Sequence, residues 1–158
     1  MENITLNNAL TLSFPDGFRR LTEAETNKLT FIEAGEGVCL RDEERHILVS
    51  LGYKKVGLLP RLTLDSVDVA KASQARVAAA MKAYGYRQLR WQNGRMDGKK
   101  ACGFRYTYQA QGVNMAGDCC VVKDGGVIYY LNAYVREAGQ EESFRLWEEI
   151  LNAARWMK

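Results

Sequence analysis

The sequence has no apolar run that approaches the roughly 20 residues needed to span a bilayer, which excludes a transmembrane helix. The first residues, Met1 to Thr5, also lack the basic and apolar regions of a signal peptide. Only two prolines occur, Pro15 and Pro60, and no segment rich in Ser, Gly and Pro divides the chain. We therefore expect one cytoplasmic domain over residues 1–158, a length that supports a hydrophobic core without metals or disulfides.

Histidine and cysteine are also scarce, and their spacing excludes the common metal and disulfide patterns. With His46 as the one histidine and no CxxC motif, the sequence offers no set of zinc ligands. Cys119 and Cys120 are adjacent, so their side chains point to opposite faces of a strand and are poorly placed to bond each other. We expect these two, together with Cys39 and Cys102, to be free and mostly buried thiols.

Acidic residues are depleted in the middle third of the chain. The net charge is +3, but residues 61–112 hold ten basic and three acidic side chains, whereas the segments on either side are each slightly acidic. The positive charge is therefore a feature of one segment and not of the whole chain.

The first part of the chain contains two hairpin patterns and a short helix. Asn7-Asn8 suits a tight turn between short strands at residues 4–6 and 9–14. Thr22 and Glu25 have the spacing of a capping box, which predicts a helix that ends before residues 31–35. A second hairpin is expected from strands at 37–42 and 47–53, and a looser connection around Pro60 follows at residues 58–64.

The second part contains the clearest helix, a meander of strands and a terminal helix. Residues 65–84 carry an apolar stripe at helical spacing, formed by Ala70, Ser73, Val77, Met81 and Tyr84, and Gly85 suits the C-terminal cap. Four strands are expected at residues 87–92, 99–108, 115–122 and 127–135, with glycine-bearing turns between them. A last helix opens at residues 139–142 and buries Phe144, Trp147, Ile150, Leu151 and Ala154, and Trp156 and Met157 seal its end against the sheet.

This order of elements predicts the fold class. Consecutive hairpins give a mainly antiparallel sheet, because the chain shows no regular alternation of strand and helix. Two amphipathic helices must each bury one face against that sheet. We therefore expect an α+β fold with helices packed on the sheet, and the small residues Ala101 and Gly103 would let a helix approach closely.

A family resemblance supports this reading. Residues 10–18, Leu-Thr-Leu-Ser-Phe-Pro-Asp-Gly-Phe, resemble the opening of PsbP/Mog-like proteins, and the similarity continues through Tyr84-Gly85-Tyr86, Asn93-Gly94 and the aromatic strand at 128–133. Phe18 stands where the family often has Trp. The resemblance implies an α/β/α sandwich, a bacterial member of this superfamily, and protein binding without catalysis, with no catalytic, cofactor or metal residues.

The most informative cluster is the basic middle segment. Basic residues accompany Tyr84, Tyr86 and Trp91, although Leu89 and Trp91 alternate as core residues do. The candidate partner-binding residues are Arg90, Arg95, Lys99, Lys100 and Arg105, with Arg87 nearby. They could bind an acidic segment of another protein or, as an alternative, nucleic acid over residues 87–105. The nucleic-acid alternative requires all five on one surface. Partner identity and oligomeric state stay open.

A lesser alternative is a small enzyme that uses Cys39 and His46. Such a site would need the thiol and the imidazole within hydrogen-bonding reach in a pocket. The simpler interpretation places His46 at a strand end beside a turn. Two other motifs have similarly plain interpretations: the acidic run 42–44 is a solvated loop, and the glycine-bearing basic segment 93–100 is a hairpin turn and not a phosphate-binding loop.

Overall fold

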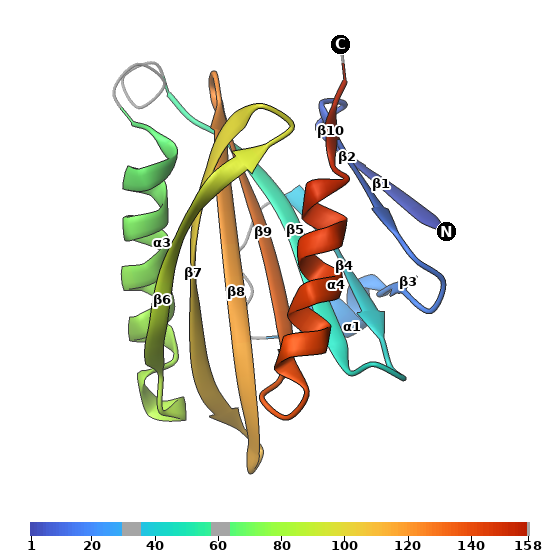
Figure 1. The fold of residues 1–158 in the computed structure, drawn as a ribbon, viewed down its shortest axis with the longest axis vertical. Helices are drawn as coiled ribbons and strands as arrows, with labels where there is room; N and C mark the ends of the chain where they lie inside the picture. The colour runs from blue at the N-terminus through green and yellow to red at the C-terminus, as the bar shows by residue number, and fades with distance from the viewer. Residues whose placement is uncertain (30–35, 58–63, 158) are drawn as a thin grey trace.

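The computed structural model describes residues 1–29, 36–57 and 64–157. A seven-stranded antiparallel sheet has the order β3-β4-β5-β9-β8-β7-β6, and a separate three-stranded sheet has the order β1-β2-β10 (Figure 1). The strands are β1 (Glu2–Leu6), β2 (Leu10–Phe14), β3 (Arg19–Arg20), β4 (Glu36–Asp42), β5 (Ile47–Lys55), β6 (Arg87–Met96), β7 (Lys99–Ala110), β8 (Val113–Asp124), β9 (Val127–Arg136) and β10 (Arg155–Trp156). The helices are α1 (Glu23–Asn27), α3 (Ser66–Ala80), the 3₁₀ turn η1 (Lys82–Tyr84) and α4 (Gln140–Asn152).

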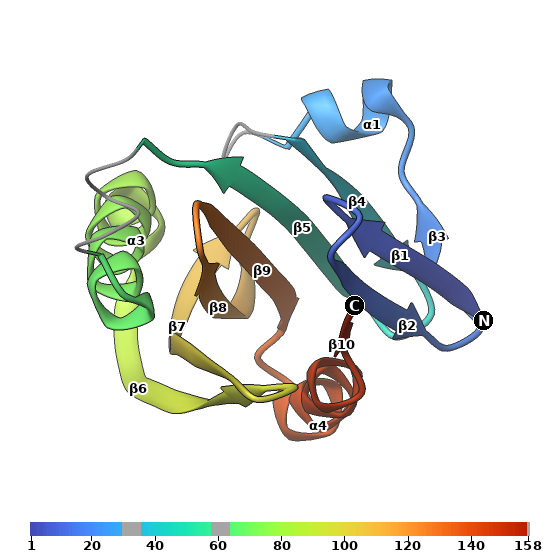
Figure 2. The same ribbon diagram turned by 90° about the horizontal axis from the view of Figure 1, so that it is seen from above.

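The two faces of the large sheet are covered by different elements. Helix α3 packs on the face formed by the aromatic side chains of β7, whereas α4 and the small sheet cover the opposite face (Figure 2). Strict alternation in β7 sends Phe104, Tyr106 and Tyr108 into the α3 side of the core. The expected α+β fold, mainly antiparallel with helices on the sheet, is confirmed.

Tight turns explain the antiparallel topology. Asn7 and Asn8 have φ angles of 53° and 50°, as a two-residue hairpin turn requires. The turn between β6 and β7 is shorter than expected, because Asp97 and Gly98 alone supply the two positive φ angles. The β6–β7 pairing therefore continues through Asn93 to Met96, which the sequence had indicated as part of the turn.

The helix boundaries follow their caps. Thr22 and Glu25 form the expected capping box of α1, and Asp65 and Asp68 form another at the start of α3. Gly85 has the expected left-handed conformation, with φ of 73°.

The apolar stripe of α3 ends earlier than expected. Ala70, Ser73 and Met81 are buried, but Tyr84 is 50% exposed. The α-helix ends at Ala80 and the chain continues as a 3₁₀ turn, whose tighter winding removes Tyr84 from the stripe.

The cysteines are as expected, whereas the residues at the C-terminal end are only partly so. The four cysteines are free, and three of them are buried, as expected. Trp156 donates its indole N–H to the Met96 carbonyl at 2.8 Å and so reaches the large sheet, whereas Met157 is 56% exposed and seals nothing. Leu151 is only half-buried. The expected connection around Pro60 and the end of the first helix at residues 31–35 lie outside the described residues.

Gly103 has a different role from the expected one. A Cβ atom at this position would lie 1.9 Å from the backbone oxygen of Cys119, so glycine here serves the approach of β8 to β7. The helix whose backbone comes closest to β7 and β8 is α3, which lies on the opposite, aromatic face. No helix in the described part of the chain has the length and apolar character that a membrane crossing requires.

The close packing of Gly117 against Tyr106 on the aromatic face leads to a prediction about stability. A Cβ atom at Gly117 would lie 2.2 Å from Cζ of Tyr106, whose ring is 1% exposed and cannot move aside freely. We expect Gly117→Ala to destabilise the protein by about 1–3 kcal/mol in urea unfolding. Gly94→Ala is the matched control: its Cβ would meet no atom within 4 Å, so its stability should stay within about 0.5 kcal/mol of wild type. Equal stability of the two variants would contradict this packing.

Candidate functional site

The five basic residues singled out from the sequence all lie on the β6–β7 hairpin, but they are divided between the two faces of the sheet. Arg90 pairs with Arg105 across the strands, and Arg95 pairs with Lys100. Arg105 contacts Glu148 of α4, whereas Lys100 lies 3.9 Å from Asp65 at the start of α3. By alternation, Arg90, Lys99 and Arg105 lie on the α4 face, and Arg95 and Lys100 lie on the α3 face. The single basic surface that the nucleic-acid alternative requires is not formed.

Three of the five cations are already paired. Lys99 binds Asp124 at 2.6 Å and lies 4.9 Å from the centre of the Trp156 ring. Lys100 pairs with Asp65, and Arg105 pairs with both Asp118 and Glu148.

The remaining cations belong to β6. Arg90 donates to Gln92 at 3.3 Å, and Arg95 donates to the Gly98 carbonyl at 3.1 Å. Within residues 1–29, 36–57 and 64–157, no ion pair neutralises Arg87, Arg90 or Arg95. Within the β6–β7 hairpin, the uncompensated positive charge therefore lies along β6.

Beneath this strand is a buried polar network centred on Asp118 of β8. The carboxylate is 3% exposed and accepts hydrogen bonds from Arg105 at 2.7 Å, Gln92 at 2.9 Å and the Trp147 indole at 3.2 Å. The Arg105 guanidinium also stacks 4.3 Å from the centre of the Phe144 ring. The network ties β6, β7 and β8 to α4, because one residue comes from each strand and three helix residues, Phe144, Trp147 and Glu148, contact them.

None of the candidate residues drawn from the sequence except Arg105 belongs to this network, although Asp118 has a recognisable sequence signal. Asp118 shares a strand face with Ala116 and Val122, both fully buried. A charged residue in such a position must have a buried partner. The helix residues Trp147 and Glu148 show no comparable pattern, because each fits an ordinary amphipathic helix.

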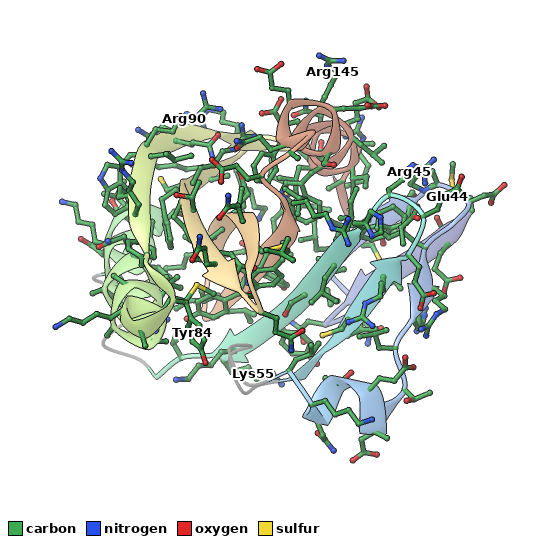
Figure 3. The ribbon with its side chains drawn as sticks, turned by 90° about the horizontal axis from the view of Figure 1, so that it is seen from below. Glu44, Arg45, Lys55, Tyr84, Arg90 and Arg145 are labelled. Carbon is green, nitrogen blue, oxygen red and sulfur yellow. The ribbon has the colours of Figure 1, made fainter. Side chains whose placement is uncertain are left out.

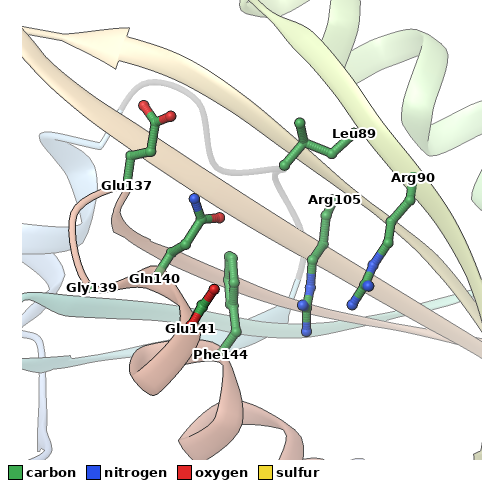
Figure 4. A pocket seen from close by; sticks show the side chains of 8 residues that line it. All are labelled: Leu89, Arg90, Arg105, Glu137, Gly139, Gln140, Glu141 and Phe144. Carbon is green, nitrogen blue, oxygen red and sulfur yellow. The ribbon is translucent and has the colours of Figure 1, made fainter.

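A pocket of about 460 Å³ lies between β6 and the first turn of α4. Arg90 and Arg105 extend into it side by side, Phe144 lies beside Arg105, and Leu89 forms the wall on the strand side (Figure 4). The opposite wall comes from the start of α4 and the segment before it, and includes Glu137, Gln140 and Glu141. The pocket therefore has a basic strand side and an acidic helix side.

Strand β6 itself is exposed at most of its ten residues. It is an edge strand that pairs only with β7 among the described strands. The register shifts between Gln88 and Arg90, so Leu89 lies in a bulge. Leu89 and Trp91 are each 49% exposed, which corrects the expectation that they are core residues. The reason is that β6 lies at the edge, where no other described strand covers its outer side. Figure 3 shows Arg90 projecting outward from β6 on the side of α4.

The geometry does not support the Cys39–His46 alternative. Cys39 pairs with Ser50, whereas His46 lies beyond the last pair of that hairpin, Asp42 with Ile47. At about 3.3 Å per residue, three residues separate Cys39 from the turn by roughly 10 Å. Burial raises the pKa of the Cys39 thiol, and His46 is exposed with φ of 56°. The two side chains therefore do not form a nucleophile–base pair.

The acidic run 42–44 has a structural role. Asp42 is 1% exposed, accepts from the Arg45 backbone N–H at 2.9 Å and pairs with the Arg45 guanidinium. Glu43 pairs with Arg19 at 2.9 Å. In the part of the chain that the structure describes, no three His, Cys, Asp or Glu side chains are grouped to hold a metal ion.

The Asp118 network makes a second prediction. Asp118→Ala removes one of two carboxylates from the largely buried Arg105 and leaves Trp147 without its acceptor, so we expect a loss of about 3 kcal/mol of stability in urea unfolding. Asp124→Ala is the control, because its pair with Lys99 is half-exposed and should cost less than about 1 kcal/mol. A cost for Asp118→Ala as small as that of the control would contradict a structural role for the network.

No protein-family model and no curated protein matches the sequence. Solved structures do match over nearly the whole chain. The cyanobacterial PsbP (CyanoP) of Synechocystis sp. PCC 6803 is similar with a TM-score of 0.74 at 14% identity, covering 99% of this chain and 92% of that one. The Ran-binding protein Mog1p of Saccharomyces cerevisiae has a TM-score of 0.60 at 11% identity, covering 98% and 94%.

A third similar structure is LpqN of Mycobacterium tuberculosis, which is involved in cell envelope biogenesis. Its TM-score is 0.60 at 16% identity, and the match covers 94% of this chain and 83% of that one. These likenesses confirm the resemblance that residues 10–18 first indicated. The chain therefore has the PsbP/Mog-like fold.

Proposed function

We propose that this protein is a non-catalytic interaction domain that binds another protein through the outer surface of β6. The observation that carries the proposal is the composition of this edge strand. It exposes two large apolar side chains, Leu89 and Trp91, among three cations, Arg87, Arg90 and Arg95. Trp and Arg are among the residue types enriched in binding hot spots, and Leu89 adds exposed apolar surface beside them.

The proposal refines the candidate set drawn from the sequence. Arg90 and Arg95 remain available for a partner, and Arg87 joins them. Lys99, Lys100 and Arg105 serve instead in the ion pairs that hold the hairpin to β8, α3 and α4. The binding surface is therefore the edge of β6 and not the whole basic segment.

The state of the cysteine thiols also supports a binding role over a catalytic one. Burial raises the pKa of the Cys39, Cys102 and Cys120 thiols, which leaves them protonated and unreactive near neutral pH. Among solved structures with this fold, Mog1p is described as a Ran-binding protein, which supports protein binding as a use of the fold. Four free thiols agree with our proposal of a reducing, cytoplasmic location.

An affinity experiment tests the proposed surface. Wild-type protein and a Leu89→Ser/Trp91→Ser variant are immobilised and exposed to lysate of the organism that encodes the protein, with and without nuclease. We expect defined proteins that survive nuclease treatment, with capture by the variant reduced by roughly tenfold or more. Quantitative mass spectrometry measures the difference.

The matched control is Val113→Ser/Met157→Ser, which removes two other exposed apolar side chains from outside β6. It should capture the same proteins as wild type. Equal capture by all three baits would place the surface elsewhere, and capture that nuclease abolishes would favour nucleic acid as the partner.

A further inference from the structure

The outer edge of β6 has the features of a strand that accepts another strand. β6 is ten residues long, whereas the other edge strand of the large sheet, β3, has only two residues. In an edge strand, the N–H and C=O groups of alternate residues point outward without a partner. Such an edge pairs readily with an extended segment of another chain.

The charges on the two edges differ in the same way as their lengths. At β3, Arg19 pairs with Glu25 and Glu43, and Arg20 pairs with Glu2. The β3 edge is therefore short, and the charges of its two arginines are neutralised. The sequence of β6, Arg-Gln-Leu-Arg-Trp-Gln-Asn-Gly-Arg-Met, has three arginines and no acidic residue. Its positive charge is left for a partner to compensate.

This charge pattern disfavours a second copy of the same chain as the occupant. An antiparallel pair of β6 strands centred on Trp91 would place Arg87 of each copy opposite Arg95 of the other. A parallel pair in register would place each arginine beside itself. Like charges in directly opposed positions destabilise strand pairing. The edge therefore excludes its own copies in these registers and favours an acidic segment.

The side chains of β6 also indicate where the charges of such a segment would lie. The register with β7 places Arg87 and Arg90 on the α4 face, and Trp91 on the α3 face, where its ring packs 5.7 Å from that of Phe104. Acidic side chains of an added strand would meet the two arginines, and apolar ones would cover Trp91. The acidic residues Glu137 and Glu141 lie on the helix side of the pocket, away from this edge (Figure 4).

From these observations we infer that β6 accepts an extended acidic segment of a partner protein as an eighth strand of the sheet, with acidic and apolar side chains alternating along that segment. The inference rests on the proposed function and names the class of partner. Backbone hydrogen bonds hold the added strand, and the arginines select its charge.

A synthetic probe tests this directly. The probe is a fluorescent peptide of ten residues, the length of β6, in which Glu alternates with Val. A Lys–Val peptide of the same length tests charge selection, and a Glu–Val peptide N-methylated at alternate residues tests the backbone hydrogen bonds. Fluorescence anisotropy measures the affinities, and hydrogen exchange measures protection of the β6 amides. We expect the Glu–Val peptide to bind and protect β6, and both comparison peptides to bind at least about tenfold more weakly.

Two charge-reversal variants of the protein test whether the arginines of β6 select the acidic peptide. Arg87→Glu/Arg90→Glu should lose affinity for the Glu–Val peptide by about tenfold or more. Lys55→Glu/Arg145→Glu, which changes the net charge equally at exposed sites on β5 and α4, should bind it as wild type does. Thermal unfolding of both variants shows whether each is folded.

Each contrary result has a distinct meaning. No binding of the Glu–Val peptide, or equal binding of its N-methylated form, overturns strand addition. Tighter binding of a ten-nucleotide single-stranded DNA with the same dependence on Arg87 and Arg90 overturns the protein partner in favour of nucleic acid. If the Leu89/Trp91 variant still loses captured proteins while the peptide fails, the interaction domain stands and only the acidic strand is wrong.

Discussion

One buried carboxylate, that of Asp118, links the outer strands β6, β7 and β8 of the large sheet to helix α4. Asp118 accepts hydrogen bonds from Gln92, Arg105 and Trp147, which belong to the edge strand, its neighbour and the terminal helix. A buried charge is costly unless it is paired, so its three donors must stay in place. This requirement adds a buried side-chain link, through Gln92, to the backbone pairing with β7 that holds β6 on the sheet. The same carboxylate forms an ion pair with Arg105. Arg90, the cross-strand neighbour of Arg105, does not share this ion pair and is available to a partner.

The two edges of the large sheet are protected from pairing with other strands in different ways. An open sheet has two edges, and natural proteins protect them with short strands, prolines, bulges or charges. β3 is short and its arginines are paired, but β6 is long, has no proline and relies on a bulge at Leu89 and on three arginines. Charges of one sign disfavour pairing with a second copy in the registers that oppose its arginines, while they attract an acidic strand. Protection against self-association and selection of a partner thus come from the same residues.

Much of the fold was predictable because its signals are local. Asn7-Asn8, the capping box at Thr22 and the alternation of Phe104 and Tyr106 each specify a turn, a helix start or a buried face from a few adjacent residues. The candidate surface was only partly predictable. The basic segment was evident, but its division between two faces depends on the pairing of Arg90 with Arg105 and of Arg95 with Lys100. The exposure of Trp91 depends on β6 being an edge strand, which follows from the order of strands and not from the strand's own sequence.

The central claim is that the outer edge of β6 is open in the free protein. Hydrogen exchange followed residue by residue by NMR tests this most directly, because paired and unpaired amides of one strand differ in protection. We predict that alternate amides in residues 87–96 exchange rapidly, whereas those between, and the amides of β7 and β8, are protected. Uniform protection along β6 at low protein concentration would show that the edge is already covered and would contradict the account.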